Sequence, residues 1–368
     1  MKREGLYYIA FCLLLTTCID PFDIGDVVEG RARLVVDGLL TNEAKAHEVR
    51  VSYSSPTLST FDAEPVINAE VVIEDENGSQ VQLSEEREGV YFTPPNFAGA
   101  VGVSYTLHIR TTENISYRSL PEVMQPVAEI ESIYAEPASR TSLSSIGTLI
   151  DNWGLQFYLN TGTGLPESNF YRWEWEETYE FMAPLMREMQ LETPICYQTN
   201  RPFRALLISS SQDFTQDRIE RQPINFVSKA TYKLQRRYSL LVTQYSLTER
   251  AFNFWNDIEA QRDADGSLFD PPPSRIIGNM VREDDPNETV LGYFQVSAVT
   301  QKRAFVARSE VPAEPGGPVR GFSSCVEPVG GDAPGDGGVI SAEDDGPPEF
   351  CYDCRLIPGV TTERPSFW

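Results

Sequence analysis

Apolar and polar residues alternate in short segments from Ala32 to about residue 120. Val103 to Ile109 alternates strictly, which is the period of a strand with one buried face. Asn77-Gly78 separates two such runs and is the strongest short hairpin signal that a sequence offers. The pattern predicts an immunoglobulin-like or carboxypeptidase-regulatory-like β-sandwich over residues 32–120.

A second, larger β-rich domain is predicted over residues 127–368, after a linker between Pro121 and Pro126. Trp153 to Leu159 and Tyr171 to Trp175 alternate as strands do. Further strands are predicted at 204–209, 224–227, 238–245, 290–299 and 304–306. The fold class that follows is mainly β.

One amphipathic helix interrupts this region. Ser246 to Glu249 has the spacing of a capping box, which satisfies two orphan backbone donors at a helix start. Apolar residues at 251, 254, 255 and 258 then recur at helical intervals, and Gly266 is a plausible stop. We expect this helix to pack one face on a sheet.

Residues 311–349 differ in composition, since 16 of these 39 residues are Gly or Pro. A long exposed and flexible loop is the predicted structure.

The N-terminus predicts export and lipid attachment. Residues 1–17 combine a basic start with an apolar run from Leu6 to Leu15, too short to span a bilayer and typical of a signal peptide. Leu15-Thr16-Thr17-Cys18 resembles the lipobox of bacterial lipoproteins, in which the Cys thiol is acylated. Residues 18–31 then form a lipidated acidic tether, which resembles surface-export signals or is a solvated linker. The alternative is a plain secretory peptide in which Cys18 is incidental.

The negative net charge of the chain excludes some classes of function. The chain has 30 Lys and Arg against 54 Asp and Glu, a formal charge of -24, and two His. No basic stripe exists to displace counterions from phosphate, so we expect no nucleic-acid partner. On strand alternation His108 faces away from the apolar side, and His47 lies at a strand entrance, so both are predicted to be solvated rather than metal ligands.

Four cysteines follow Cys18: Cys196, Cys325, Cys351 and Cys354. An even number in an exported protein favours two disulfides, with three pairings open. A zinc site with four Cys ligands, or a redox pair at Cys351 and Cys354, are the alternatives.

The clusters of acidic residues do not match the known patterns of catalytic sites. Glu174, Glu176, Glu177 and Glu180 could host a glycosidase-like carboxylate pair, but alternation turns Glu174 and Glu176 away from the aromatic face, toward solvent. The run from Asp263 to Asp270 lacks the register of an EF-hand and is better explained as a helix end. No nucleophile elbow, phosphate loop or dinucleotide fingerprint occurs. We therefore predict no enzyme activity, no catalytic residues, no metal and no cofactor.

Short motifs in a fixed order extend along nearly the whole chain. They are Leu34–Gly38, Gly89–Tyr91, Tyr105–Leu107, Asp217–Ile219, Pro223–Ile224, Tyr238–Leu240, Ala251–Trp255, Gly266–Pro273, Gly278–Asn279, Leu291–Phe294, Cys351–Arg355 and Pro365–Trp368. In this order the chain resembles a family of Bacteroidetes outer-membrane lipoproteins known only as a domain of unknown function, numbered four-two-four-nine. The resemblance implies a gene neighbourhood with TonB-dependent outer-membrane receptors and no assigned catalytic residues.

The function predicted from these observations is a surface-exposed outer-membrane lipoprotein. It would be held in the membrane by outer-membrane lipid on the acylated Cys18 and act as a non-enzymatic accessory or binding subunit of a TonB-dependent uptake system. The alternatives are a self-standing adhesin or polymer-binding lipoprotein and, more remotely, an exported hydrolase.

Overall fold

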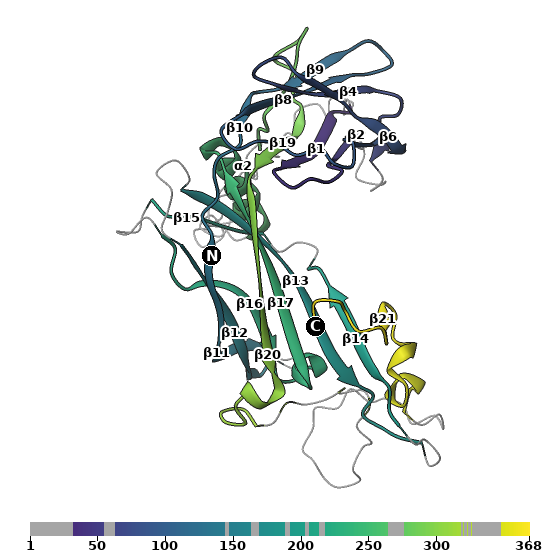
Figure 1. Cartoon of the computed structure of the whole chain (residues 1–368), viewed down its shortest axis with the longest axis vertical. Helices are drawn as coiled ribbons and strands as arrows, with labels where there is room; N and C mark the ends of the chain where they lie inside the picture. Colours follow the sequence, from purple (N-terminus) through teal and green to yellow (C-terminus); the bar gives the residue numbers. More distant parts are fainter. Residues whose placement is uncertain are drawn as a thin grey trace, which may run out of the picture.

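The structure is a computed structural model that describes residues 32–54, 63–143, 147–162, 169–187, 192–202, 206–212, 218–263, 276–317, 319, 322, 325 and 347–368. It is built mainly from β-strands arranged in two lobes, one above the other in Figure 1. The predicted mainly β fold class, with sandwich character and a packed helix, is confirmed.

The upper lobe is a sandwich of two sheets. The first sheet has the order β19 (Leu291–Ser297), β1 (Leu34–Thr41), β2 (Glu48–Tyr53), β7 (Val90–Phe92) and β6 (Ser84–Arg87), with β3 (Glu64–Pro65) beside β2. The second has the order β18 (Met280–Arg282), β9 (Ser116–Ser119), β8 (Ser104–Arg110), β4 (Glu70–Asp75) and β5 (Gln80–Gln82), with β10 (Glu122–Val123) beside β8. Alternate residues of each strand, such as Val36, Val51 and Leu107, are fully or almost fully buried in one shared core. The β4–β5 hairpin turns at Asn77-Gly78, as predicted.

Two strands of this sandwich come from far along the chain. β19 pairs in parallel with β1, and β18 pairs with β9. The predicted domain division assigned residues 280–297 to the second domain, whereas the structure places the two strands within this range, β18 and β19, in the sheets of the first. At the close approach of β19 to β1, a Cβ on Gly292 would lie 1.9 Å from the carbonyl oxygen of Val36, and the residue has a φ of +83°. Only glycine fits there.

The lower lobe contains a three-stranded and a larger sheet. The smaller sheet has the order β11 (Ile130–Leu143), β12 (Leu149–Thr161) and β16 (Gln222–Ser228). The larger has the order β20 (Val299–Ala307), β17 (Arg237–Leu247), β13 (Phe170–Met182), β14 (Ile195–Asn200) and β21 (Val360–Thr361), with β15 (Leu207–Ser210) beside β13. Short 3-10 helices lie at Tyr232–Leu234, Arg308–Glu310, Glu349–Cys351 and Cys354–Leu356. The two sheets enclose a core rich in aromatic side chains, with Trp173, Phe157 and Tyr238 at its centre.

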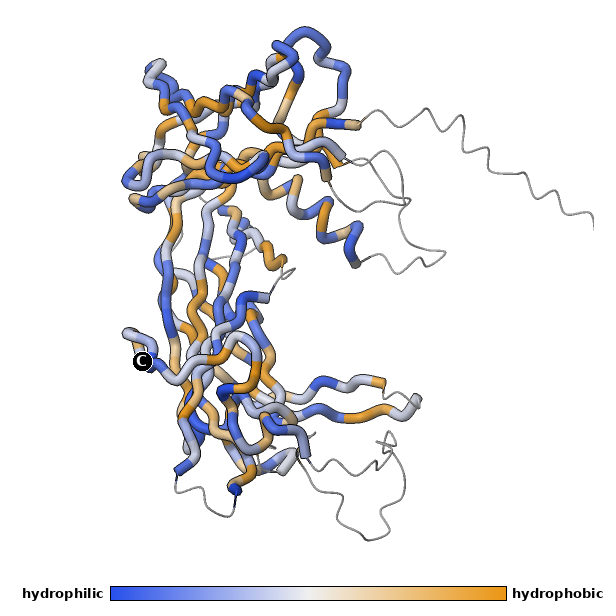
Figure 2. Tube along the Cα trace, turned by 90° about the vertical axis from the view of Figure 1, so that its right-hand side faces the viewer, coloured by the Kyte–Doolittle hydropathy of each residue, from blue (hydrophilic) through white to orange (hydrophobic). Residues whose placement is uncertain are grey.

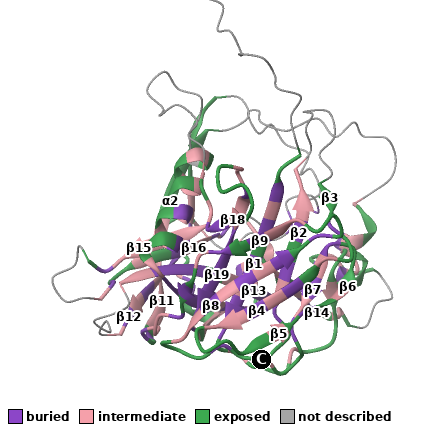
Figure 3. Cartoon of the chain, turned by 90° about the horizontal axis from the view of Figure 1, so that it is seen from above, coloured by how far each residue is buried: buried purple, intermediate pink, exposed green. Residues whose placement is uncertain are grey.

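The predicted helix is α2 (Glu249–Asp263). It begins after Thr248, whose hydroxyl accepts a hydrogen bond from the Ala251 amide, so Thr248 is the cap. The predicted cap at Ser246 is wrong, because Ser246 lies in β17 and its hydroxyl donates to the Gln125 carbonyl oxygen instead. One side of α2 packs on β13, β15 and β17, and much of the rest is exposed when the molecule is viewed from above in Figure 3.

Three further local predictions are corrected. His47 is buried, not solvated: its Nε2 lies 3.1 Å from the carbonyl oxygens of Glu43 and Phe97, and its Nδ1 accepts from the Thr41 amide at 3.4 Å. The linker predicted between Pro121 and Pro126 contains β10. The region 311–349 is not uniformly exposed, since Val311, Phe322 and Cys325 are buried. His108, by contrast, does point away from the core and lies 3.6 Å from Glu74.

Candidate functional site

A groove runs between the two lobes. Two adjoining hollows of about 460 and 830 Å³ share Arg172, Glu174, Trp255 and Ile258, and together form what we call the interlobe groove. The upper wall comes from β1, β2 and β19, and the lower wall from β13, β17 and α2. Both lobes therefore contribute to one concave surface.

Arg172 lies at the centre of the interlobe groove and is held in place on several sides. Its guanidinium carbon lies 4.7 Å from the ring centre of Tyr245 and 4.7 Å from that of Trp255. Its Nη1 lies 2.9 Å from a carboxylate oxygen of Glu174. A planar guanidinium between two aromatic rings and a carboxylate is preorganised, because few rotamers satisfy all three contacts.

Glu174 and Glu176 lie on the same face of β13 and are each engaged by cations or hydroxyls. The Tyr245 hydroxyl donates to Glu174 at 2.9 Å, and burial together with this carboxylate raises the pKa of Tyr245. Arg201 donates to Glu176 at 2.8 Å, and Arg303 lies 3.6 Å from it. Both carboxylates face away from the lower core, as the alternation predicted, but they are ion-paired rather than simply solvated.

The other two predicted carboxylates do not join them. Glu177 points into the lower lobe, is buried, and accepts from the Tyr238 hydroxyl at 2.9 Å. Glu180 accepts from Arg236 at 2.6 Å and from the Trp368 indole at 2.9 Å. Each of the four carboxylates therefore has its own protein donors.

Trp255 fixes α2 against the upper lobe at the edge of the groove. Its indole donates to Gln295 Oε1 at 2.8 Å, and Gln295 in turn donates to the Ser297 hydroxyl at 2.7 Å. Nε of Arg172 and Nε1 of Trp175 are buried without a hydrogen-bond partner in the described part of the chain. Buried N–H groups are almost always satisfied in folded proteins, so these two donors are local exceptions inside the protein.

Asp37 contributes a carboxylate to the upper wall. Its pKa is raised because protein surrounding the side chain limits its hydration, an effect that Arg50 and Arg172 partly oppose. The groove thus combines cations, carboxylates and aromatic faces within a short distance. Such a surface can offer both stacking and hydrogen bonding. Among the described residues no group of three or more His, Cys, Asp or Glu has the arrangement of a metal site.

Glu122 lies beside the groove at the junction of the lobes and was missed by the sequence reading, which treated its neighbourhood as a linker. This carboxylate is 1% exposed and accepts from the Tyr293 hydroxyl at 2.6 Å, the Thr248 hydroxyl at 2.6 Å and Arg250 Nη1 at 2.9 Å. Thr248 and Arg250 are at the start of α2, where the helix dipole also favours an anion. Glu122 therefore joins a strand of the upper lobe to the helix of the lower lobe.

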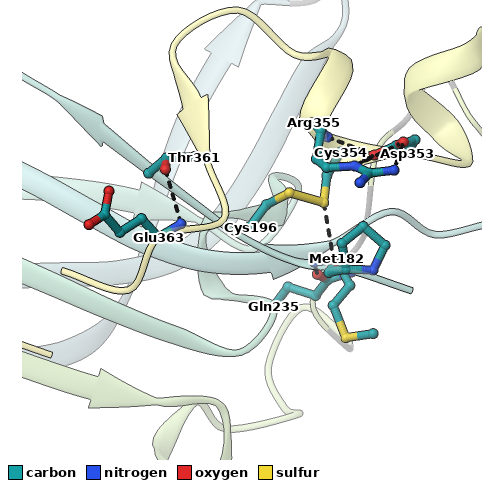
Figure 4. The surroundings of a disulfide bond; sticks show 9 residues. Met182, Cys196, Gln235, Asp353, Cys354, Arg355, Thr361 and Glu363 are labelled. Carbon is teal, nitrogen blue, oxygen red and sulfur yellow. Dashed lines mark hydrogen bonds and ion pairs between the residues drawn. A yellow bond between two sulfur atoms is a disulfide. The ribbon is translucent and has the colours of Figure 1, made fainter. Parts of the chain in front are cut away.

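The four distal cysteines form two disulfides, as predicted: Cys196 with Cys354, and Cys325 with Cys351. This pairing settles the open connectivity and excludes a small ring between Cys351 and Cys354. The first disulfide joins β14 to the C-terminal segment, and Sγ of Cys354 lies 3.3 Å from the Pro194 carbonyl oxygen (Figure 4). A hollow of about 1020 Å³ lies beside it, with Arg187, Glu192 and Glu349 among its lining residues.

The predicted lipid-attachment site Cys18 lies outside the described residues, and so do residues 264–270 of the acidic run that was explained as a helix end. In the part of the chain that is described, no helix has the length and apolar character needed to cross a bilayer.

Comparison with known proteins places the chain in a family. None of the curated proteins matches it. The family model described as Domain of unknown function (DUF4249) matches residues 19–303, which include the upper lobe, α2, β13 and β17 and therefore both walls of the interlobe groove. The chain belongs to the DUF4249 family.

Proposed function

We propose that this protein is a non-enzymatic accessory subunit of a TonB-dependent outer-membrane uptake system, and that the interlobe groove is the surface on which it binds its partner receptor. The observation that carries the proposal is Arg172, held between two aromatic rings at the centre of a groove that both lobes form. Arg, Trp and Tyr are the residue types that dominate binding energy at protein interfaces.

The state of the carboxylates supports binding rather than catalysis. Glu174 and Glu176 are each held by Arg or Tyr side chains. A general base must be within reach of a substrate proton, and these oxygens are already engaged by protein donors.

The location is part of the same proposal. The lipobox-like sequence that ends at Cys18 supports a lipid anchor in the outer membrane, with the acidic tether leading to a folded part on the cell surface. Two or three acyl chains on one Cys give stable anchoring, because each buried methylene contributes about 0.8 kcal/mol. Intact mass of the mature N-terminus tests this: an acylated Cys18 supports the anchor, and an unmodified N-terminus at another residue contradicts it.

The partner is tested by purifying the full-length protein from its native membrane in mild detergent and identifying what co-purifies. The wild type is compared with a Lys45→Ala, Arg201→Ala variant, which removes two exposed groove cations with little effect on stability. Arg118→Ala is the matched control, because Arg118 is an exposed, ion-paired arginine of the upper lobe outside the groove.

We expect a near-stoichiometric outer-membrane receptor with the wild type and the control, and much less with the groove variant. Recovery of the protein alone from wild-type membranes contradicts the accessory role and favours the self-standing polymer-binding lipoprotein. Equal recovery of a receptor by the groove variant would show that the partner binds elsewhere.

A further inference from the structure

A β-hairpin arm extends from the lower lobe. β11 and β12 pair from Ile130 to Leu143, but β16 pairs with β12 only from Gly154 onward, so the outer part of the hairpin has no third strand among the described residues. In Figure 2 this hairpin extends away from the body, to the same side as the helix. We call residues 139–143 and 147–152 the arm, and its end, with Leu143, Leu149 and Ile150, the tip.

The arm is exposed and its end is apolar. Every described residue from Ser139 to Leu143 and from Gly147 to Asp151 is exposed. At the end of the arm Leu143 and Leu149 are each 70% exposed, and Ile150 is 50% exposed. Exposed large apolar side chains are common singly, but three at the end of one projecting element are a concentration that calls for a functional explanation.

The apolar side chains point to both faces of the hairpin. Leu143 and Leu149 are directly paired across the strands and share one face, while Ile150 is paired with Ser142 and faces the other way. A flat partner surface would cover only one of these faces. An apolar medium that surrounds the tip covers both.

Charge limits how deep the tip can enter such a medium. The nine residues from Ser142 to Ile150 carry no charge, in a chain whose net charge is -24. The nearest charged groups, Arg140 and Asp151, are held by Gln156 and Thr141 respectively. Leu149 and Ile150, the two strand residues beyond Asp151, extend about 7 Å, which lies within the shallow depth of about 5–10 Å at which interfacial elements bury.

We propose that the tip of the arm inserts into the lipid bilayer, as a second membrane contact beside the lipid anchor. The inference rests in part on the anchor of the proposed function. The predicted tether of residues 18–31 extends to at most about 50 Å, so the anchor allows the folded part many orientations at the membrane surface. Anchoring also raises the effective concentration of the tip at the bilayer, so that a shallow insertion becomes populated.

The test uses the acylated full-length protein reconstituted into vesicles of phosphatidylethanolamine with a minor fraction of phosphatidylglycerol. Leu149→Cys carries an environment-sensitive fluorophore, which is selective because the four distal cysteines are in disulfides. Val101→Cys is the matched control, since Val101 is an apolar residue, 48% exposed, on a turn of the upper lobe. A third protein adds Leu143→Asp and Ile150→Asp to the labelled Leu149→Cys chain.

We expect the fluorophore at residue 149 to shift to shorter wavelength and to be quenched by a lipid-borne quencher, while the one at residue 101 stays in water. The two Asp substitutions should abolish both signals without changing the melting temperature, because the replaced side chains are exposed. Equal exposure at residues 149 and 101 in vesicles would overturn the inference. So would protection of residue 149 that appears only when a co-purified receptor is present, because the tip would then occupy a protein pocket. Mass spectrometry of Cys18 is a separate readout, so failure of the anchor and failure of the arm are distinguishable.

Discussion

The two lobes are built on the same principle but from different cores. Fully buried side chains of the upper lobe are mostly aliphatic, as with Leu34, Val36 and Leu107. Those of the lower lobe include many large aromatic groups, among them Trp173, Phe157 and Tyr238. The two disulfides of the described chain both lie in the lower lobe.

This difference changes what each core requires. Aliphatic side chains have no polar atoms, so most of the upper core is specified by the alternation of residues along each strand, and buried polar side chains such as His47 are exceptions there. Buried Tyr and Trp carry polar atoms that need partners. The Trp173 indole donates to Gln244 Oε1 at 2.8 Å, and Gln244 donates to the Ala128 carbonyl oxygen at 2.7 Å. The stability of the lower lobe therefore depends on specific contacts between residues far apart in the sequence.

The largest effect is expected from the disulfides. Cys196 and Cys354 are 158 residues apart, against 26 for Cys325 and Cys351. Loop entropy predicts a stabilisation of about 5 kcal/mol for the first and about 3.5 kcal/mol for the second. Denaturant titration of the Cys196→Ser, Cys354→Ser and the Cys325→Ser, Cys351→Ser double variants should show that order.

Hydrogen exchange on the first of these variants then sharpens the comparison. Backbone amides of β14 and β21 should exchange faster than in the wild type, while those of β4 and β8 in the upper lobe stay protected. Uniform loss of protection in both lobes would mean that the lobes unfold as one unit, and that the difference between their cores has no consequence for stability.

Glu122 is expected to have the next largest effect, because it joins the lobes. Glu122→Ala removes a buried acceptor and leaves the Tyr293 hydroxyl and the Asn279 amide without it, at a cost of about 2–4 kcal/mol. Glu131→Ala is the control, since Glu131 is an exposed partner of Arg218 at 3.5 Å and should change stability by less than about 0.5 kcal/mol. Similar thermal melts for the two variants would contradict the role given to Glu122.

His47 should make the stability of the upper lobe depend on pH. Burial lowers the pKa of His47 in the folded state, so the unfolded chain binds a proton first as pH falls. The stabilisation is therefore complete above the unfolded pKa of about 6.5 and is lost progressively as pH falls below it toward the lower, folded-state pKa. His47→Ala should cost about 2 kcal/mol at pH 8 and less at acid pH.

The matched control is His108→Ala, because His108 is partly exposed on a strand of the same lobe. That variant should stay within about 0.5 kcal/mol of the wild type. A cost of His47→Ala that does not shrink between pH 8 and pH 5 would contradict the assignment of a neutral, buried imidazole.

The smallest effect is expected at Asp37. Its folded-state pKa is raised, so above its unfolded pKa the ionised carboxylate destabilises the folded protein. Asp37→Asn should stabilise the protein at neutral pH and lose that advantage near pH 3. Because the side chain is exposed, solvent screening keeps the gain below about 1 kcal/mol. Destabilisation by Asp37→Asn at pH 7 would show that attraction to Arg50 and Arg172 outweighs desolvation.

The sequence predicted what short-range patterns encode. Alternation identified β2, β4, β8, β12 and β13, and the Asn77-Gly78 turn identified a hairpin. The count of cysteines predicted two disulfides but could not choose their pairing, which depends on where β14 and the C-terminal segment meet in space.

Long-range features escaped prediction for physical reasons. The parallel pairing of β1 with β19 has no turn between its strands, so nothing local marks it. His47 and Glu122 are polar residues that look solvated in sequence, and only the carbonyl and hydroxyl groups around them explain their burial. The interlobe groove was missed in the same way, because Arg172 acquires its aromatic neighbours from β17 and α2, far from β13 in sequence.

The central claim is that the interlobe groove binds a receptor in the outer membrane. Site-specific photocrosslinking in native membranes tests it most directly, with a photoreactive amino acid in place of Arg201, whose side chain is 82% exposed in the groove, or in place of Arg118 outside it. We expect a crosslinked outer-membrane receptor from position 201 and none from position 118. A receptor crosslinked from position 118, or none from position 201 while a receptor still co-purifies, would contradict it.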